Sequence, residues 1–203
     1  MDSKNTTAMN LFLRYALLGL STTSLVLTAV RPTAAETEAS ASPSPHAVEA
    51  IRLLDDKDSY QRQVGFLRLE ALREPATVPI VMKYLESPDP DTRGYSLRAL
   101  AAIDGARAVP LLLGALSTDR HPTVRRAALL GLEPLYRTDP QIVPAFIKAL
   151  RDAKTEVRIT AVDIVSRIDD PTARDAILRR NKRERRRDVR RALDLAMKRL
   201  KGS

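Results

Sequence analysis

The sequence predicts an all-α protein built as a stack of antiparallel helix pairs, and three periodic observations predict it. A string that begins Val-Pro and closes on Leu occurs three times, over residues 78–85, 109–116 and 143–150. Arginines recur at steps of 31, 32, 33 and 32 residues, at Arg62, Arg93, Arg125, Arg158 and Arg190. Six positions before each arginine stand Asp56, Ser87, Asp119, Asp152 and Glu184. A period near 32 residues is typical of stacked helical hairpins, because one hairpin alone cannot bury its apolar face.

Residues 1–35 lie outside the repeat and are predicted to be a signal peptide. Lys4 and Arg14 precede the uncharged run 15–30, and the small residues Thr33-Ala34-Ala35 follow it, as at a cleavage site. We therefore expect the protein to be exported, that is periplasmic or secreted. Two alternatives stay open. One is an uncleaved anchor, with membrane contact only through residues 11–30 and the repeats outside the cytoplasm. The other is a terminal helix of the fold.

Residues 36–45 are rich in Pro, Ser and Glu and are predicted to form a disordered linker, because they hold no core-forming side chain. The repeat domain then occupies residues 46–203. Its first segment, 46–54, reads as a second helix without its mate, and its last, 188–200, as a first helix without its mate. Between these caps we expect first helices around each fixed arginine, as in 119–136 and 152–168. We expect second helices at 78–85, 106–116, 140–150 and 171–181.

The repeat pattern resembles the short HEAT-like repeats of the phycobilisome-lyase type. Asp152 followed by Val157-Arg158 and Ala161 matches best, and the resemblance covers residues 46–200. The first repeat departs at Gln61 and Gly65, and the last at Leu193. The resemblance implies an armadillo-like, right-handed α-α superhelical solenoid with about four full repeats between half-repeat caps. It also implies a ladder of ion pairs between neighbouring repeats, formed by Arg62, Arg93, Arg125, Arg158 and Arg190 with Asp56, Asp119 and Asp152.

A second periodic line is basic and lies two residues before the closing leucine of each second helix. The line consists of Arg52, Lys83, Lys148 and Arg179, with Gly114 in the remaining slot. The resemblance places second helices on the concave face, so this row, together with Arg183, Arg186 and Arg187, is the candidate partner-binding surface. The alternative is that these residues occupy ordinary solvent-exposed helix positions and do not bind a partner.

The charge is concentrated at the C-terminus. Residues 179–201 hold 12 Lys and Arg against three Asp and Glu, a surplus equal to the net charge of +9 of the whole chain. This basic C-terminus is predicted to be either an anion-binding patch or a solubilising cap.

No catalytic constellation is visible in the sequence. Cysteine is absent, which excludes a disulfide framework and a thiolate site. Histidine occurs only at His46 and His121, and no Gly-rich phosphate loop, G-x-S-x-G or H-E-x-x-H string is present. We therefore predict no catalytic residue, no metal and no cofactor.

These observations predict a non-enzymatic interaction scaffold that docks a protein or peptide with an acidic surface in its concave groove. No small-molecule substrate is expected. A bilin-lyase-like enzyme or chaperone, implied by the resemblance, is the first alternative. A nucleic-acid-binding HEAT-like protein is the second.

Overall fold

The structure is a computed structural model that describes residues 42–202, with side chains described to residue 200. Every regular element in this range is a helix. The α-helices are α3 (Pro45–Arg52), α4 (Ser59–Leu72), α5 (Val78–Met82), α6 (Pro90–Asp104), α7 (Val109–Thr118), α8 (Pro122–Leu132), α9 (Ile142–Ala149), α10 (Thr155–Val165), α11 (Pro171–Arg183) and α12 (Arg187–Gly202). The 3-10 helices are η1 (Pro75–Thr77), η2 (Lys83–Glu86), η3 (Gly105–Ala108) and η4 (Glu133–Leu135).

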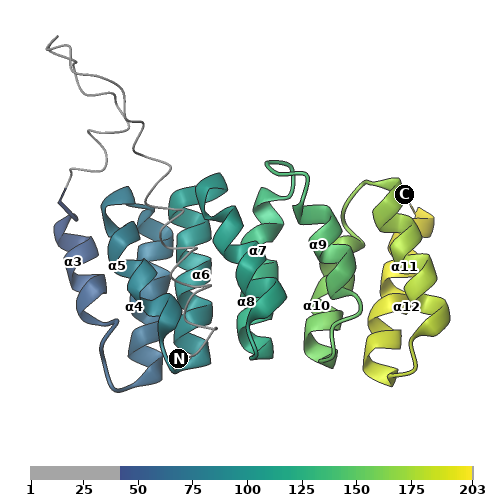
Figure 1. Cartoon of the computed structure of the whole chain (residues 1–203), viewed down its shortest axis with the longest axis horizontal. Coiled ribbons are helices and arrows are strands. Elements are labelled where there is room, and N and C mark those ends of the chain that lie inside the picture. Colours follow the sequence, from purple (N-terminus) through teal and green to yellow (C-terminus); the bar gives the residue numbers. More distant parts are fainter. Residues whose placement is uncertain (1–41, 203) are drawn as a thin grey trace, which may run out of the picture. The chain divides into compact units, whose positions relative to one another are not determined.

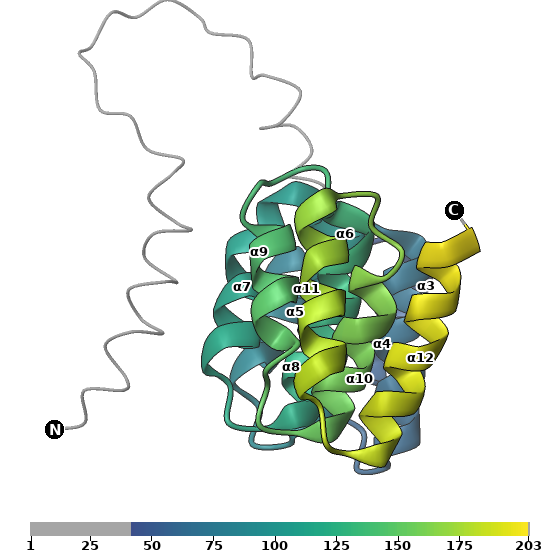
Figure 2. The same ribbon diagram turned by 90° about the vertical axis from the view of Figure 1, so that its right-hand side faces the viewer.

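The helices form two layers that follow the chain from one repeat to the next (Figure 1). First helices pack on first helices, in the order α4, α6, α8, α10 and α12. Each second helix packs on the first helix of the following repeat, as α7 does on α8 and α11 on α12 (Figure 2). Among the described elements, α3 and α12 stand at the two ends without a mate. The all-α solenoid prediction is confirmed, and the predicted signal peptide lies outside the described residues.

Proline and aspartate set the helix starts. Asp89 precedes Pro90 and accepts hydrogen bonds from the N–H groups of Asp91 and Thr92. Asp170 does the same before Pro171, for the N–H groups of Thr172 and Ala173. Proline at the first helical position loses no hydrogen bond, because that N–H has no partner within the helix.

The start of the domain differs from the linker prediction. Ser44 and Pro45, placed in the linker by the sequence, are the N-cap and first residue of α3. Ser44 also donates from its N–H and Oγ to the Glu74 carboxylate, at 2.9 and 2.5 Å. These contacts anchor the end of the linker on the first repeat.

One second helix differs from its predicted form. The predicted helix 78–85 contains only one α-helical segment, α5, followed by the tighter η2.

The segment Pro90–Thr118 is apolar and long enough, by length and composition, to cross a membrane. It is not one helix, however, because Gly105 has a φ of 56° and turns the chain between α6 and η3. Leu97, Leu100 and Leu112 of this segment are buried in the core.

One core runs through all repeats. Its largest fully buried side chains come from both layers: Phe66, Phe146, Leu54, Leu69, Leu100, Leu112, Leu129, Leu132, Ile142, Ile164, Ile177 and Leu193. Gly65 shows how closely α3 approaches α4, because a Cβ atom there would lie 2.8 Å from the carbonyl oxygen of Ala50. This contact explains why the first repeat has glycine where later repeats have Ala128 and Ala161.

Helix α12 closes the stack by a change at one repeat position. Four residues after the fixed arginine, the preceding repeats bury an apolar side chain: Phe66, Leu97, Leu129 and Val162. In α12 this position is Asp194, which is exposed. The inner face of α12 still buries Val189, Leu193 and Ala196. The terminal helix is therefore apolar toward α10 and α11 and polar on its other side, as a capping repeat requires.

Candidate functional site

The fixed arginines join neighbouring repeats at the edge where second helices connect to first helices. Arg93 donates from Nε and Nη2 to the Asp119 carboxylate at 3.0 and 3.1 Å. Its Nη1 donates to the carbonyl oxygens of Ser87 and Pro88 at 2.8 and 3.3 Å. Arg125 binds Asp152 in the same forked way, at 2.7 Å for both bonds. Each guanidinium thus fixes its own loop and holds the next repeat.

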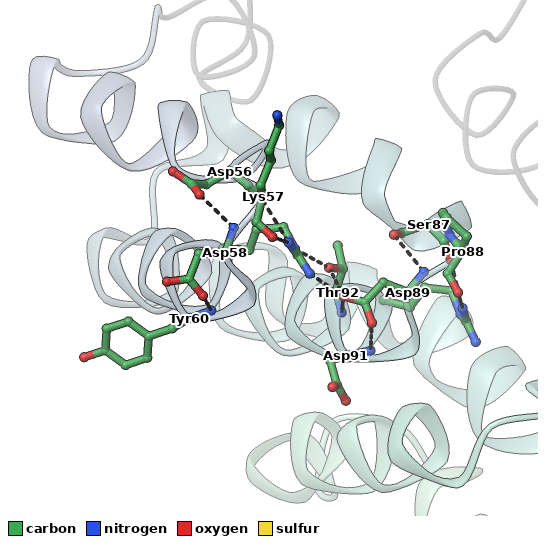
Figure 3. Close-up of polar contacts among 11 residues, drawn as sticks. Asp56, Lys57, Asp58, Tyr60, Ser87, Pro88, Asp89, Asp91 and Thr92 are labelled. Atoms are coloured by element: carbon green, nitrogen blue, oxygen red, sulfur yellow. Dashed lines mark hydrogen bonds and ion pairs between the residues drawn. The ribbon is translucent and has the colours of Figure 1, made fainter.

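The ladder differs from the predicted one at both ends. Arg62 pairs with Asp89, at 2.9 Å, because Ser87, which stands where the later repeats have Asp119 and Asp152, carries no charge. The carboxylate of Asp56 accepts only from the N–H of Asp58 within the described residues (Figure 3). Arg190 is exposed, and no ion pair joins it to any other residue in the range 42–200. The inclusion of Asp56 and Arg190 in the ladder is therefore corrected: within residues 42–200, neither residue forms an ion pair with a neighbouring repeat.

The last ion pair of the ladder, between Arg158 and Glu184, is the most buried one. The Glu184 carboxylate binds Arg158 at 3.1 Å and also Arg180, and it accepts from the N–H groups of Arg185 and Arg186 at 2.9 Å each. Side-chain exposure is 8% for Arg158 and 3% for Glu184. Burial alone would raise the pKa of Glu184, but the hydrogen bonds from Arg186 N–H and Arg180 outweigh it and lower the pKa to about 2.

This lowered pKa predicts acid sensitivity. A carboxylate whose pKa is lower in the folded than in the unfolded state stabilises the fold above its unfolded pKa, and that stability is lost as pH falls toward the folded value. We expect Glu184 to contribute such a loss between pH 4.5 and about 2. Glu184→Gln should flatten the dependence of the unfolding free energy on pH in this window, measured by urea unfolding at several pH values. Asp188→Asn, at an exposed position, is the control, and equal slopes in all three proteins would contradict the prediction.

A second set of ion pairs joins the first helices nearer their C-terminal ends. Arg98 binds Glu70 at 3.1 Å and Arg199 binds Asp163 at 2.9 Å. Arg167 binds Glu133 at 2.8 Å. In each case an arginine reaches back to the preceding repeat, opposite in direction to the ladder. The sequence analysis missed this set, because only part of it recurs: Arg167 and Arg199 lie nine residues after a fixed arginine, but Arg98 lies five after one. These side chains are one-third to one-half exposed, so each pair contributes at most about 1 kcal/mol.

A groove of about 750 Å³ lies between the second helices α7 and α9. Leu113, Leu116, Ala145 and Ala149 give it an apolar lining, and Lys148 and Arg151 add positive charge. Asp119 and Asp152 also border the groove, but both are paired in the ladder. The groove therefore offers apolar surface beside two cations, Lys148 and Arg151, that form no ion pair within residues 42–200.

A smaller cleft lies next to this groove, between α9 and α11. It is lined by Ile147, Leu150, Arg151, Ala176, Arg179, Arg180 and Arg183. Arg151 borders both spaces.

The candidate partner-binding residues are divided between these spaces and the open surface. Lys148 lines the groove, and Arg179 and Arg183 line the cleft. The others line neither and are exposed: Arg52, Lys83, Arg186 and Arg187. Sequence reasoning missed Arg151, which directly follows the closing Leu150 and could have been found as a second cation beside Lys148.

The described residues offer binding rather than acid–base chemistry. No group of three His, Cys, Asp or Glu side chains that could hold a metal ion occurs within residues 42–200. The carboxylates beside the groove, Asp119 and Asp152, already bind arginines and the backbone N–H groups of His121 and Lys154, just before α8 and α10. The arrangement can hold a ligand with an apolar body and negative groups.

Two curated proteins are similar to parts of this chain. The phycocyanobilin lyase subunit beta of Nostoc sp. strain PCC 7120 is 42% identical over 59 residues, which cover 29% of this chain and 30% of that protein. The bilin biosynthesis protein RpcF of Synechococcus sp. strain WH8020 is 33% identical over 92 residues, or 42% of this chain and 44% of that protein. The chain thus matches less than half the length of either relative.

These relatives correct the functional expectation. The prediction of a non-enzymatic scaffold is wrong, because proteins named as a lyase subunit and a bilin biosynthesis protein favour the lyase-like alternative. The prediction rested on the lack of a catalytic constellation, yet a protein that binds and orients a reactive ligand needs none of its own. The expectation that no small-molecule substrate takes part loses its basis for the same reason.

The fold and the repeat family are shown by the remaining comparisons. A solved complex of CpcE and CpcF of phycocyanin lyase from Nostoc sp. contains a chain that superposes with a TM-score of 0.63 at 23% identity. The match covers 74% of this chain and 97% of that one. The family model for HEAT repeats matches residues 47–133 and 114–198, so the matches cover the helices of both layers. The chain belongs to the HEAT-repeat family.

Proposed function

We propose that this protein is a bilin-handling subunit of lyase type, which holds an open-chain tetrapyrrole in the groove between α7 and α9. The observation that carries the proposal is the similarity to two proteins named for bilin chemistry, at 42% and 33% identity over the matched segments. The groove's size and charge, described below, give independent support.

The groove suits the chemistry of a bilin. Its volume of about 750 Å³ lies within the roughly 300–1,000 Å³ usual for small-molecule sites. A bilin has an apolar conjugated body and two propionate groups. Leu113, Leu116 and Ala145 offer surface for the pyrrole rings, while Lys148 and Arg151 attract the carboxylates.

The chain's contribution is to bind and orient the ligand. The 203 residues contain no cysteine, so they cannot themselves form a thioether with a bilin. Attachment to a thiol then takes place on another protein, which must approach the groove. A rigid groove that fixes one ligand conformation lowers the entropic cost of such a step.

A protein partner is the second part of the proposal. The similar solved structure is a complex of two chains, CpcE and CpcF, which supports assembly with another protein. The exposed basic residues Arg186 and Arg187 at the start of α12 favour a partner with an acidic surface.

Export directed by residues 1–35 stays a separate prediction. A fusion of residues 1–45 to a reporter that is active only outside the cytoplasm tests it. Reporter activity would support export, and activity confined to the cytoplasm would contradict it.

Titration with phycocyanobilin tests the ligand-binding proposal. The pigment's absorption and fluorescence should change saturably on binding to the repeat domain. Lys148→Glu should weaken binding by about tenfold, since one favourable charge contact is lost and a repulsive one is introduced. Lys83→Glu is the matched control, at the same repeat position but outside the groove, and should change the affinity less than about twofold. No saturable change with the wild-type protein would refute the proposal.

A further inference from the structure

The cleft between α9 and α11 is lined by an unusual number of positively charged side chains. Four arginines line it, from the ends of two neighbouring second helices: Arg151, Arg179, Arg180 and Arg183. Its volume of about 40 Å³ has room for one or a few water-sized groups. A small charged group fits such a space, and a pyrrole ring does not.

Two of the four arginines form no ion pair within the described residues, and a third forms only a long one. No ion pair or side-chain hydrogen bond joins Arg151 or Arg183 to another residue in the range 42–200. The contact of Arg179 with Asp175 is long, at 3.7 Å, and both side chains are about 60% exposed. Lysine and arginine near a helix C-terminus often bind the last carbonyl groups, but none of these three does so in the described region.

Arg180 also lines the cleft and carries a buried donor. Its Nη2 binds Glu184, but its Nε is buried and has no hydrogen-bond partner among the described atoms. An unpaired buried donor is unfavourable, so a ligand oxygen that reaches this atom would gain free energy. Glu184 does not neutralise the cleft, because Arg158 shares its charge.

We propose that this four-arginine cleft is a carboxylate subsite that receives a propionate group of the bilin. The inference rests on the function proposed above and assigns to the cleft the recognition of one end of the same ligand. Arg151 connects the two spaces, since it lines both the groove and the cleft. Rings lying against Leu116 and Ala149 would leave a propionate on the side of α11. A guanidinium binds a carboxylate through two parallel hydrogen bonds, which fixes the direction of the ligand as well as its affinity.

The test compares phycocyanobilin as the free diacid with its dimethyl ester, which has the same ring system but no carboxylate charge. Wild-type protein is expected to bind the diacid at least about tenfold more tightly than the diester, as one or two charged hydrogen bonds require. In Arg151→Gln/Arg183→Gln this preference should fall to about twofold or less, with the affinity for the diester nearly unchanged. Arg186→Gln/Arg187→Gln removes the same net charge outside the cleft and should keep the wild-type preference.

The outcomes separate the two proposals. If neither pigment binds the wild-type protein, the proposed function fails and this inference fails with it. If both bind but the cleft variant keeps the full preference for the diacid, the propionate subsite is refuted while bilin binding stands. Equal loss of preference in the cleft and control variants would also refute the subsite, because general charge attraction would then explain it. Single variants Arg179→Gln and Arg183→Gln, both at exposed positions, supply the same comparison if the double cleft variant unfolds at a lower temperature.

Discussion

Replacing Arg158 with alanine is expected to lower the free energy of unfolding by about 3–5 kcal/mol, the range found when one partner of a buried ion pair is removed. Arg158 holds the last two repeats together through Glu184 and binds the carbonyl oxygens of Asp152 and Ala153 at 2.8 and 3.2 Å. The substitution would leave those two carbonyls and part of the Glu184 charge without a partner. Since domains are stable by only about 5–15 kcal/mol in total, the variant should be close to unfolding at 37 °C.

Arg190 provides the matched control. It occupies the same repeat position, on α12, but is exposed and joins no ion pair in residues 42–200. Arg190→Ala should change stability by no more than about 0.5 kcal/mol. Arg125→Ala should fall between the two, because its side chain is slightly more exposed than that of Arg158. Urea unfolding followed by circular dichroism measures all three, and equal midpoints for Arg158→Ala and Arg190→Ala would show that the ladder does not stabilise the stack.

Phe146→Ala is the second large change, with an expected cost of about 3–5 kcal/mol. Phe146 is fully buried on α9 and is one of the largest side chains in the core. Its removal leaves a cavity that the surrounding helices can fill only in part. Because α9 also supplies Ala145 and Lys148 to the groove, the variant should lose pigment binding together with stability.

Tyr60→Ala is the control for this prediction. Tyr60 is also aromatic and helical, but it is 65% exposed, so its truncation should cost less than about 0.5 kcal/mol. Both variants are measured by thermal and urea unfolding. Similar small losses for the two would mean that α9 is not packed as tightly as its buried position requires.

The repeat period made the fold predictable, and particular residues show why. The helix pairs follow from apolar side chains at helical spacing between Pro- and Asp-rich loops, and the structure has helices at each predicted site. The broken second helix around α5 was not predictable, because its string 78–85 has the same pattern as the intact helix α7. Short 3-10 segments depend on packing against the next repeat, which local sequence does not encode.

The site was predictable only in part. A row of basic residues can be counted along the sequence, but which of them border a cavity depends on the spacing between helices. Lys83 and Lys148 occupy equivalent positions, yet only Lys148 lines the groove. Arg151 and Arg180 lie outside the counted row and enter the site because α9 and α11 end side by side. The acceptor of Arg62, Asp89, was likewise not among the predicted ladder acids, because it lies two residues after Ser87, the repeat position at which the later acceptors stand.

The two sets of ion pairs, taken together, bear on how this protein can deform. The ladder joins neighbouring repeats at the starts of the first helices, and the pairs of Arg98, Arg167 and Arg199 join them nearer the ends. Within residues 42–200, no ion pair joins one second helix to another. In this part of the chain, the ends of α7 and α9 are tied only through Arg125, which binds the carbonyl oxygen of Asp119 and the carboxylate of Asp152. A bulky guest between α7 and α9 would therefore separate these helices most easily at their N-terminal ends, which lie away from Arg125.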